Sequence, residues 1–383
     1  MRYVVTLVHG TWAFGLPILV WLRRKLGLTE RTIWTHPSSV VCQYLTEHLT
    51  VDGLAPVLLP FRWSGRNRVL ERARAAEDLI GYLGNMARVY PDARQILIGH
   101  SHGGTVVLYA LRDAIAEARV AGVICLGTPF LYARPRLGPF GWKCLTHGSG
   151  ILFGLVGGAI ALTLQVPGPP IARFLLRLAL WAFVVAIAVI TVRAWIRGAE
   201  RMRQRLALPL IKQSRILIVR APGDEALGVL GGLRVMGAAM GLGWGVLAWP
   251  GGGLMRFAER LGRASIGSGI GVIQRGATRL ASLCLGFLAG AYLTVAGLIL
   301  VPVAVLTSLI LWPVGLELVP FGLLLDVTIE PSPAGTWPVY WQPRPPASET
   351  SSSLTGRGLD HSSSYDDPRA LETIVDWINE LGN

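Results

Sequence analysis

The segment Gly99-His100-Ser101-His102-Gly103 has the residue types of a serine nucleophile. It follows an apolar run over 95–98 and precedes a helical pattern that opens at Gly103. A serine between small residues on a sharp strand-to-helix turn holds its hydroxyl clear of the sheet. The start of the following helix favours the negative charge that develops during acyl transfer. We therefore predict that Ser101 is a nucleophile; a serine in an ordinary exposed turn is the alternative.

A second segment, Val8-His9-Gly10-Thr11-Trp12, directly follows the first apolar run. An oxyanion hole needs two backbone N–H groups that point to one place. The residue after the nucleophile, His102, is predicted to supply one of them, and Thr11 is predicted to supply the other, with Trp12 as the alternative. The residues expected to support these turns are His9, Gly10, Trp12, Gly99 and Gly103.

A serine nucleophile needs a general base, and His361 is our prediction for it. In the chain order Ser…Asp/Glu…His the base comes last, and His361 alone follows every predicted core strand. His9 belongs to the oxyanion loop, and the turn is expected to direct His100 and His102 away from the serine hydroxyl. The remaining candidates are His36, His48 and His147.

The acid that orients the base should follow a strand between Ser101 and His361. Residues 216–219 are an apolar strand pattern that ends in the Pro222-Gly223 turn, and Asp224 stands just beyond it. We predict that Asp224 is the third member of the triad. Glu225 and Asp326 are the alternatives, and either could instead be a helix cap or a surface charge.

These residues need a parallel sheet to bring them together. Buried-strand patterns occur at 3–9, 54–61, 95–99 and 121–126, and helical patterns lie between them at 37–50, 66–89 and 104–118. Strand–helix alternation predicts βαβ units, and hence an α/β class with a mainly parallel sheet. Further strands are predicted at 323–330 and 337–342, followed by a Ser-rich loop and a last amphipathic helix over 368–381.

Two long apolar insertions interrupt this pattern. Residues 144–172 and 178–192 contain no charged residue and predict a helical hairpin with its turn near Pro167-Gly168-Pro169-Pro170. Residues 235–255 are uncharged and include a GxxxG pattern at 237–241. Residues 280–316 are also uncharged, and prolines at 302 and 313 predict two short helices or a kinked pair there. A soluble lid that caps the core is the alternative to insertion in a membrane.

Composition agrees with a membrane protein. The chain of 383 residues is 52% hydrophobic and only 15% charged, whereas soluble domains carry about 25% charged residues. Its net charge of +13 is concentrated beside the apolar runs, which favours membrane flanks over nucleic-acid binding. The four cysteines form no CxxC pair, so no metal site is predicted, and Cys125 is expected in the core. The first ten residues have a strand pattern and lack the features of a signal peptide.

Taken together, the serine turn, the His9-Gly10 loop, the Pro222-Gly223-Asp224 turn and the ending at His361 resemble the α/β-hydrolase superfamily, and within it the lipase-like serine hydrolases. Gly127-Thr128-Pro129-Phe130 and Phe61-Arg62-Trp63-Ser64-Gly65-Arg66-Asn67 also resemble segments of that superfamily. The resemblance covers about 1–132, 214–226 and 322–383. It implies an α/β-hydrolase core with two insertions, at 133–213 and 227–321.

The resemblance implies hydrolysis of carboxylic esters through a Ser101–His361–Asp224 triad and an acyl-enzyme, without a cofactor or metal. The apolar insertions predict a lipid-like substrate, membrane association and no nucleic-acid partner. Because core segments flank each insertion, each should cross the bilayer an even number of times, and the basic stretch 193–215 predicts a catalytic domain on the cytoplasmic face of the inner membrane. Amidase, thioesterase and acyltransferase activities, or a non-catalytic membrane scaffold, are the alternatives. The oligomeric state is left open.

Overall fold

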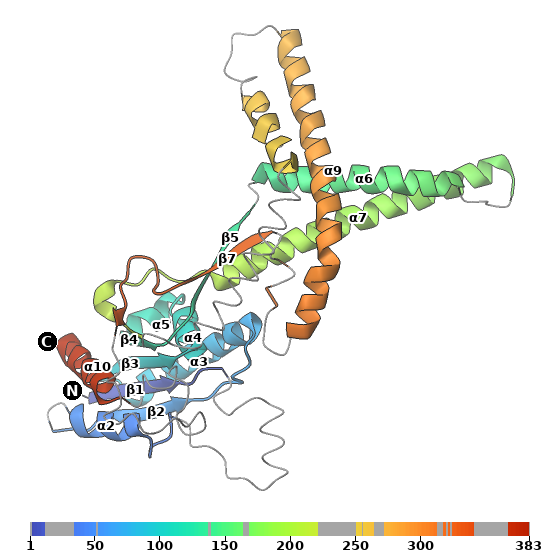
Figure 1. Ribbon diagram of the computed structural model, residues 1–383. Coiled ribbons are helices and arrows are strands. Elements are labelled where there is room, and N and C mark those ends of the chain that lie inside the picture. Colours follow the sequence, from blue (N-terminus) through green and yellow to red (C-terminus); the bar gives the residue numbers. More distant parts are fainter. Residues whose placement is uncertain are drawn as a thin grey trace, which may run out of the picture.

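Figure 1 shows an α/β core from which long helices project. The computed structural model describes these residues of the chain: 2–11, 34–50, 53–136, 139–163, 168–220, 250–254, 256–263, 272–311, 317–318, 321, 324–340 and 367–382. The candidates Trp12, Asp224, Glu225 and His361 lie outside the described residues, as does the GxxxG pattern at 237–241.

Six strands form the main sheet, in the order β2-β1-β3-β4-β6-β8. Every neighbouring pair in this sheet is parallel, which confirms the predicted α/β class. The apolar runs that predicted β1, β3 and β4 are buried in the sheet, as expected for strands covered on both faces, whereas in the edge strand β2 only Phe61 is buried. The strands are β1 (Arg2–Val8), β2 (Val57–Phe61), β3 (Ala93–His100), β4 (Val120–Leu126), β6 (Ile216–Arg220) and β8 (Val339–Tyr340).

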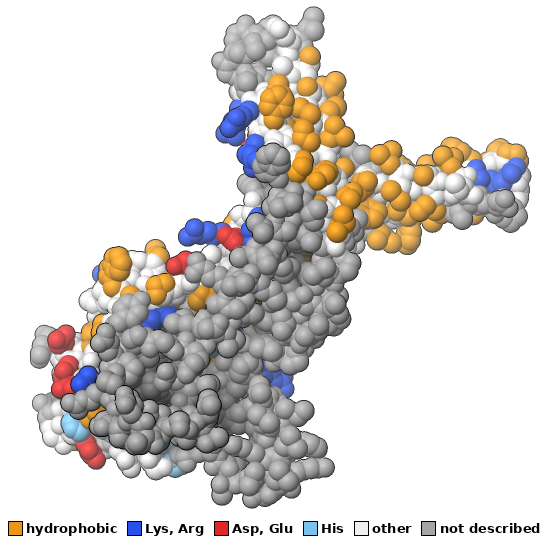
Figure 2. Space-filling view, viewed as in Figure 1, with side chains coloured by type: hydrophobic (Ala, Val, Ile, Leu, Met, Phe, Trp, Pro, Cys, Tyr) orange, Lys and Arg blue, Asp and Glu red, His pale blue; other side chains and the backbone are white. Residues whose placement is uncertain are grey.

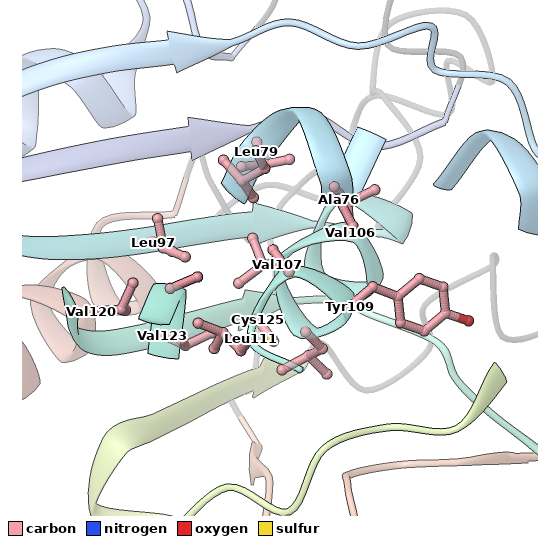
Figure 3. Close-up of a cluster of buried hydrophobic side chains, with 14 of the residues drawn as sticks. Ala76, Leu79, Leu97, Val106, Val107, Tyr109, Leu111, Val120, Val123 and Cys125 are labelled. Carbon is pink, nitrogen blue, oxygen red and sulfur yellow. The ribbon is translucent and has the colours of Figure 1, made fainter. Parts of the chain in front are cut away.

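Helices cover both faces of the sheet. On one face, α2 (Val40–His48) and α10 (Pro368–Gly382) pack against the strands in one buried cluster. On the other face, α3 (Val69–Val89), α4 (His102–Ala110) and α5 (Ala114–Arg119) form a second cluster. Figure 3 shows Val106 and Val107 of α4 in one cluster with Leu97 of β3 and Val123 of β4. The predicted helix over 104–118 is therefore two helices, since Asp113 accepts hydrogen bonds from two backbone N–H groups and begins α5.

The register aligns the carboxyl ends of the central strands. Val8 of β1 is paired with Gly99 of β3, Gly99 with Cys125 of β4, and Leu126 with Val219 of β6. The loops that follow these strands consequently meet at one edge of the sheet. Ligands of open α/β sheets bind at this edge.

A separate antiparallel pair joins the core to the insertions. Strand β5 (Phe130–Pro135) pairs with β7 (Leu325–Glu330), nearly 200 residues later in the chain. The β7 strand was predicted, but β5 was missed because it is short and contains a charged residue and a proline. In Figure 1 the pair runs from the core towards the root of the long helices.

The first insertion is the predicted helical hairpin. Helices α6 (Pro139–Thr163) and α7 (Pro170–Leu206) lie side by side, and the indole N–H of Trp181 donates to the carbonyl of Gly154 at 2.6 Å. Gly157 lets the side chain of Val184 approach α6 closely. The position of the turn, between Thr163 and Pro170, agrees with the prediction.

The second insertion differs from its prediction. A single helix, α9 (Val272–Leu311), continues through Pro302, so the expectation of two short helices or a kinked pair over 280–316 was wrong. Proline removes one backbone hydrogen bond, but in apolar surroundings the remaining backbone groups have no water to bind and are satisfied best by the helix itself. The helical residues 256–263 pack on α9, where the Ser282 hydroxyl donates to the carbonyl of Ala258 at 2.6 Å.

Small residues allow α6 and α9 to cross in contact. A side chain at Gly148 would meet the backbone of Gly290 and Ala291 within 2.3 Å, so only glycine fits there. Next to this position, the buried hydroxyls of Ser149 and Thr294 are hydrogen bonded at 2.7 Å. Small residues and interhelical hydroxyl bonds are typical of helix contacts inside membranes.

Three of the described helical segments are long and apolar enough to cross a membrane: Leu145–Thr163, Pro170–Leu206 and Gly276–Ala296. Their outward side chains are apolar, as Figure 2 shows for the two arms that leave the core. On α7, for example, Phe183 is 61% exposed and Ile190 is 65% exposed. An apolar surface of this extent marks an interaction with lipid or with another protein.

A residue beyond α9 completes a helix of the core. A carboxylate oxygen of Glu317 accepts hydrogen bonds from the backbone N–H groups of Val69 and Leu70, which open α3. The N-cap residue Arg68 makes no side-chain cap bond. Burial raises the pKa of Glu317, whereas the two N–H groups and the charge of the buried Arg72 oppose that rise. The insertion thus supplies a capping anion that α3 itself lacks.

Candidate active site

Ser101 occupies the turn between β3 and α4 in a strained backbone conformation. Its φ of 54° and ψ of −132° are unusual, and it is the one non-glycine residue with positive φ in the described part of the chain. Such a conformation costs about 1–3 kcal/mol and persists where the surroundings enforce it. Here the Ser101 N–H donates to the carbonyl of Leu126 at the end of β4, at 2.8 Å. The turn has the backbone shape expected of a nucleophile elbow.

Glycines make this turn possible by permitting very close backbone contacts. A Cβ atom at Gly99 would lie 2.5 Å from the backbone of Gly104, and one at Gly103 would lie 2.2 Å from the carbonyl oxygen of Val8. A Cβ at Gly10 would lie 2.7 Å from the Cβ of Ser101. The loop after β1 is therefore in direct contact with the serine turn, a position that the predicted oxyanion hole requires.

The structure places both predicted oxyanion donors at this edge. Thr11 follows Gly10 directly and is half-buried. His102 is the first residue of α4, so its backbone N–H is among the four that an α-helix leaves without an intrahelical partner. Ser101 is 8% exposed, which leaves the site almost enclosed by the described residues.

The two histidines beside Ser101 make contacts of their own. The Nδ1 atom of His102 lies 3.4 Å from the Oγ1 of Thr105, within α4. The ring of His100 packs edge-on against Trp34, with 6.2 Å between the ring centroids. Both side chains are buried in these positions.

His9 holds the loop after β1 in place through hydrogen bonds. Its Nδ1 lies 2.9 Å from the carbonyl oxygen of Gly10, and its Nε2 accepts a hydrogen bond from the backbone N–H of Trp63. The Trp63 indole N–H donates to the His9 carbonyl at 2.7 Å, and the two rings stack. Since Nε2 is an acceptor, the proton is on Nδ1 and is donated to Gly10. Burial lowers the pKa of His9 below its ordinary value of 6.5, which favours this neutral form.

Low pH is expected to reduce the stability that the hydrogen bonds of neutral His9 contribute. Because the pKa of His9 is lower in the folded than in the unfolded chain, its contribution to stability is complete above pH 6.5 and is lost as the pH falls through the folded pKa. Thermal unfolding midpoints measured from neutral pH downwards should fall more steeply for the wild type than for His9→Gln. The exposed His48→Gln variant should keep the wild-type slope. Equal slopes for wild type and His9→Gln would contradict this role.

Asp326, an alternative for the triad acid, is in β7. Its carboxylate forms an ion pair with Arg136 at 3.1 Å, and its side chain is 51% exposed. It belongs to the antiparallel pair that leads to the insertions and follows no strand of the main sheet. The structure therefore does not bring Asp326 to the edge that carries Ser101.

Arg220 was not considered from the sequence, although it is a buried cation at the same edge. It ends β6, is 2% exposed, and donates to the carbonyl oxygens of Thr128 and Pro331. It thereby joins the loop after β4 to the loop after β7, four residues before Asp224. A charged residue that ends the apolar run 216–219 is the signal that could have identified it.

The buried cysteine at this edge has no nucleophilic character. Cys125 is fully buried in β4, and burial raises the pKa of its thiol to about 12. It is protonated at neutral pH and packs in the core, as predicted. Within the described ranges, no group of three His, Cys, Asp or Glu side chains is arranged to hold a metal ion.

The fold and the serine turn together define an α/β protein with a parallel sheet, a strained serine at the carboxyl edge, and inserted apolar helices. No protein-family model and no curated protein matches the chain. One solved structure that is similar is a cutinase-like protein from Cryptococcus sp., with 19% sequence identity and a TM-score of 0.23. The match covers 33% of this chain and 53% of that protein, so the chain spans about half of its length. Similarity at this level defines neither activity nor substrate, and the functional argument rests on the geometry above.

Proposed function

We propose that the protein is a membrane-associated serine hydrolase of the α/β-hydrolase type that cleaves carboxylic esters. The observation that carries this proposal is the positive φ of Ser101 between β3 and α4, with the Gly10 loop packed against it. Turns that hold a serine in such a conformation present the hydroxyl to a substrate, and the strain is retained for that purpose.

In the proposed mechanism the Ser101 oxygen attacks the ester carbonyl carbon while His361 accepts the hydroxyl proton. The backbone N–H groups of Thr11 and His102 bind the oxyanion of the tetrahedral intermediate. The intermediate collapses, the C–O bond to the alcohol breaks, and His361 returns the proton to the leaving alkoxide. Water then hydrolyses the acyl-enzyme by the same steps, and Asp224 orients the imidazole throughout.

A lipid-like ester is the proposed substrate class. The α6–α7 hairpin presents an apolar surface of the length that a bilayer requires, and it is rooted next to the catalytic core. A lipid could then reach the site from the membrane without crossing water. The basic residues between Arg193 and Arg215 favour a location of the α/β core on the cytoplasmic side of the inner membrane.

Covalent labelling tests the proposal. Membrane and soluble fractions from cells that produce the full chain are treated with a fluorophosphonate, and the labelled peptide is identified by mass spectrometry. We expect the label in the membrane fraction, on the peptide that contains Ser101, with labelling reduced by competing lipid esters.

The other outcomes separate the alternatives. Label on Ser101 only in the soluble fraction would contradict membrane association but would agree with the proposed hydrolase activity. No label on folded protein would contradict the hydrolase and favour a membrane scaffold. When Ser101 is labelled, an added acceptor alcohol that yields a new ester would reveal an acyltransferase, and turnover of amides or thioesters in place of oxygen esters would reveal an amidase or thioesterase.

A further inference from the structure

A cavity lies at the tip of the α6–α7 hairpin, away from the serine turn. It has a volume of about 360 Å³, is open to one side, and is lined by the end of α6 and the beginning of α7. Its apolar wall includes Leu162, Phe174 and Trp181, and its polar groups include the guanidinium groups of Arg173 and Arg177. An apolar cavity with two convergent cations suits an amphipathic anion.

The sequence around this tip contains basic residues and no acidic ones. No Asp or Glu occurs in the sequence between Glu117 and Glu200, and Glu200 is about 35 Å from Arg177 along α7 at 1.5 Å per residue. The first residues of α7 add the positive end of a helix dipole. The tip is therefore a strongly electropositive end on an otherwise apolar arm, as Figure 2 shows.

Spacing along α7 places the tip at the level of lipid headgroups. Arg173 and Arg193 stand about 30 Å apart along the helix axis, which matches the thickness of a hydrocarbon core, and the uncharged stretch 178–192 lies between Arg177 and Arg193. Trp181 lies between these two arginines and Trp195 lies just beyond Arg193, and tryptophans are enriched near both membrane interfaces. Helical side chains lean towards the N-terminus, so Arg173 and Arg177 extend towards the tip and away from the apolar stretch.

We infer that this cavity binds the headgroup phosphate of an anionic phospholipid in the leaflet opposite the catalytic core. This inference depends on the membrane insertion included in the proposed function. The guanidinium groups of Arg173 and Arg177 bind the phosphate oxygens through charge-assisted hydrogen bonds. Phe174 and Leu162 contact the first carbons of the acyl chains. The bond from Trp181 to the carbonyl of Gly154 fixes the inner wall of the cavity.

Fluorescence quenching tests the inference at this position. The full chain is reconstituted in phosphatidylcholine nanodiscs with a small fraction of either brominated phosphatidylglycerol or brominated phosphatidylcholine. The signal of Trp181 is the difference between wild type and Trp181→Phe. We expect roughly tenfold enrichment of the anionic lipid at Trp181, because each arginine near the surface adds an appreciable attraction. R173Q/R177Q should abolish the preference, and the matched variant R193Q/R197Q, at the other end of α7, should retain it.

The outcomes distinguish this site from the esterase. Equal quenching by both lipids, or a preference that survives in R173Q/R177Q, would overturn the lipid site. No quenching by either lipid would also overturn it, since the tip would then lie outside the bilayer. Fluorophosphonate labelling of Ser101 in the same samples reports independently on the esterase. If this labelling is absent while the lipid preference at Trp181 is intact, only the enzymatic proposal is contradicted.

Discussion

Ser101→Ala is expected to lower kcat for ester hydrolysis by about 10⁴-fold or more. The remaining activity would come from substrate binding and stabilisation of the oxyanion alone. The substitution removes the one oxygen that attacks the substrate and leaves the rest of the site unchanged. Alanine has the same backbone preferences as serine at a φ of 54°, so stability should change by less than about 1 kcal/mol. Hydrolysis of a chromogenic ester and the thermal unfolding midpoint, measured on the same purified protein, check both parts.

A matched control is Ser38→Ala, which removes an exposed hydroxyl outside the site. It should retain wild-type activity. Undiminished hydrolysis by Ser101→Ala would exclude Ser101 as the nucleophile. Lost activity together with a large fall in the unfolding midpoint would instead assign Ser101 a structural function.

The largest loss of stability is expected for Gly103→Ala. The new methyl group would lie 2.2 Å from the carbonyl oxygen of Val8 and 2.6 Å from that of His9. Both contacts are with backbone of the central strand and its loop, which cannot move aside as a flexible side chain could. We expect a loss of about 3 kcal/mol or more, or failure to fold. Denaturant unfolding of the purified variants measures this difference.

Gly81→Ala is the matched control, because it adds the same methyl group where nothing lies within 4 Å. Gly81 is inside α3, where alanine is the better helix former, so this variant should gain about 0.5–1 kcal/mol. If both variants had similar stability, the close packing of β1 against the serine turn would be contradicted.

The core could be predicted from the sequence because its signals are local. Buried strands such as residues 95–98 are continuous apolar runs, and the glycines beside Ser101 mark a sharp turn whatever the rest of the chain does. The parallel order then follows from the helices between the strands. The proximity of the Gly10 loop to Ser101 also follows, since adjacent parallel strands end at the same edge of the sheet.

Features that depend on distant partners could not be predicted in this way. Strand β5 is defined by pairing with β7, far along the chain, and its six residues show no alternating apolar pattern of their own. Helix α9 continues through Pro302, whereas the proline pattern by itself predicts a break at that residue. Arg220 binds two loops that the sequence does not place beside it.

Because Glu317 caps α3, the folding of α3 depends on a residue that is synthesised much later. The carboxylate that satisfies the N–H of Val69 lies 248 residues further along the chain. Both insertions must therefore be translated before α3 can receive this carboxylate. In the serine hydrolase proposed above, the start of α3 would be capped only after the apolar helices have been synthesised. An excised core without the insertions would lack the same carboxylate and should not be treated as an independent folding unit.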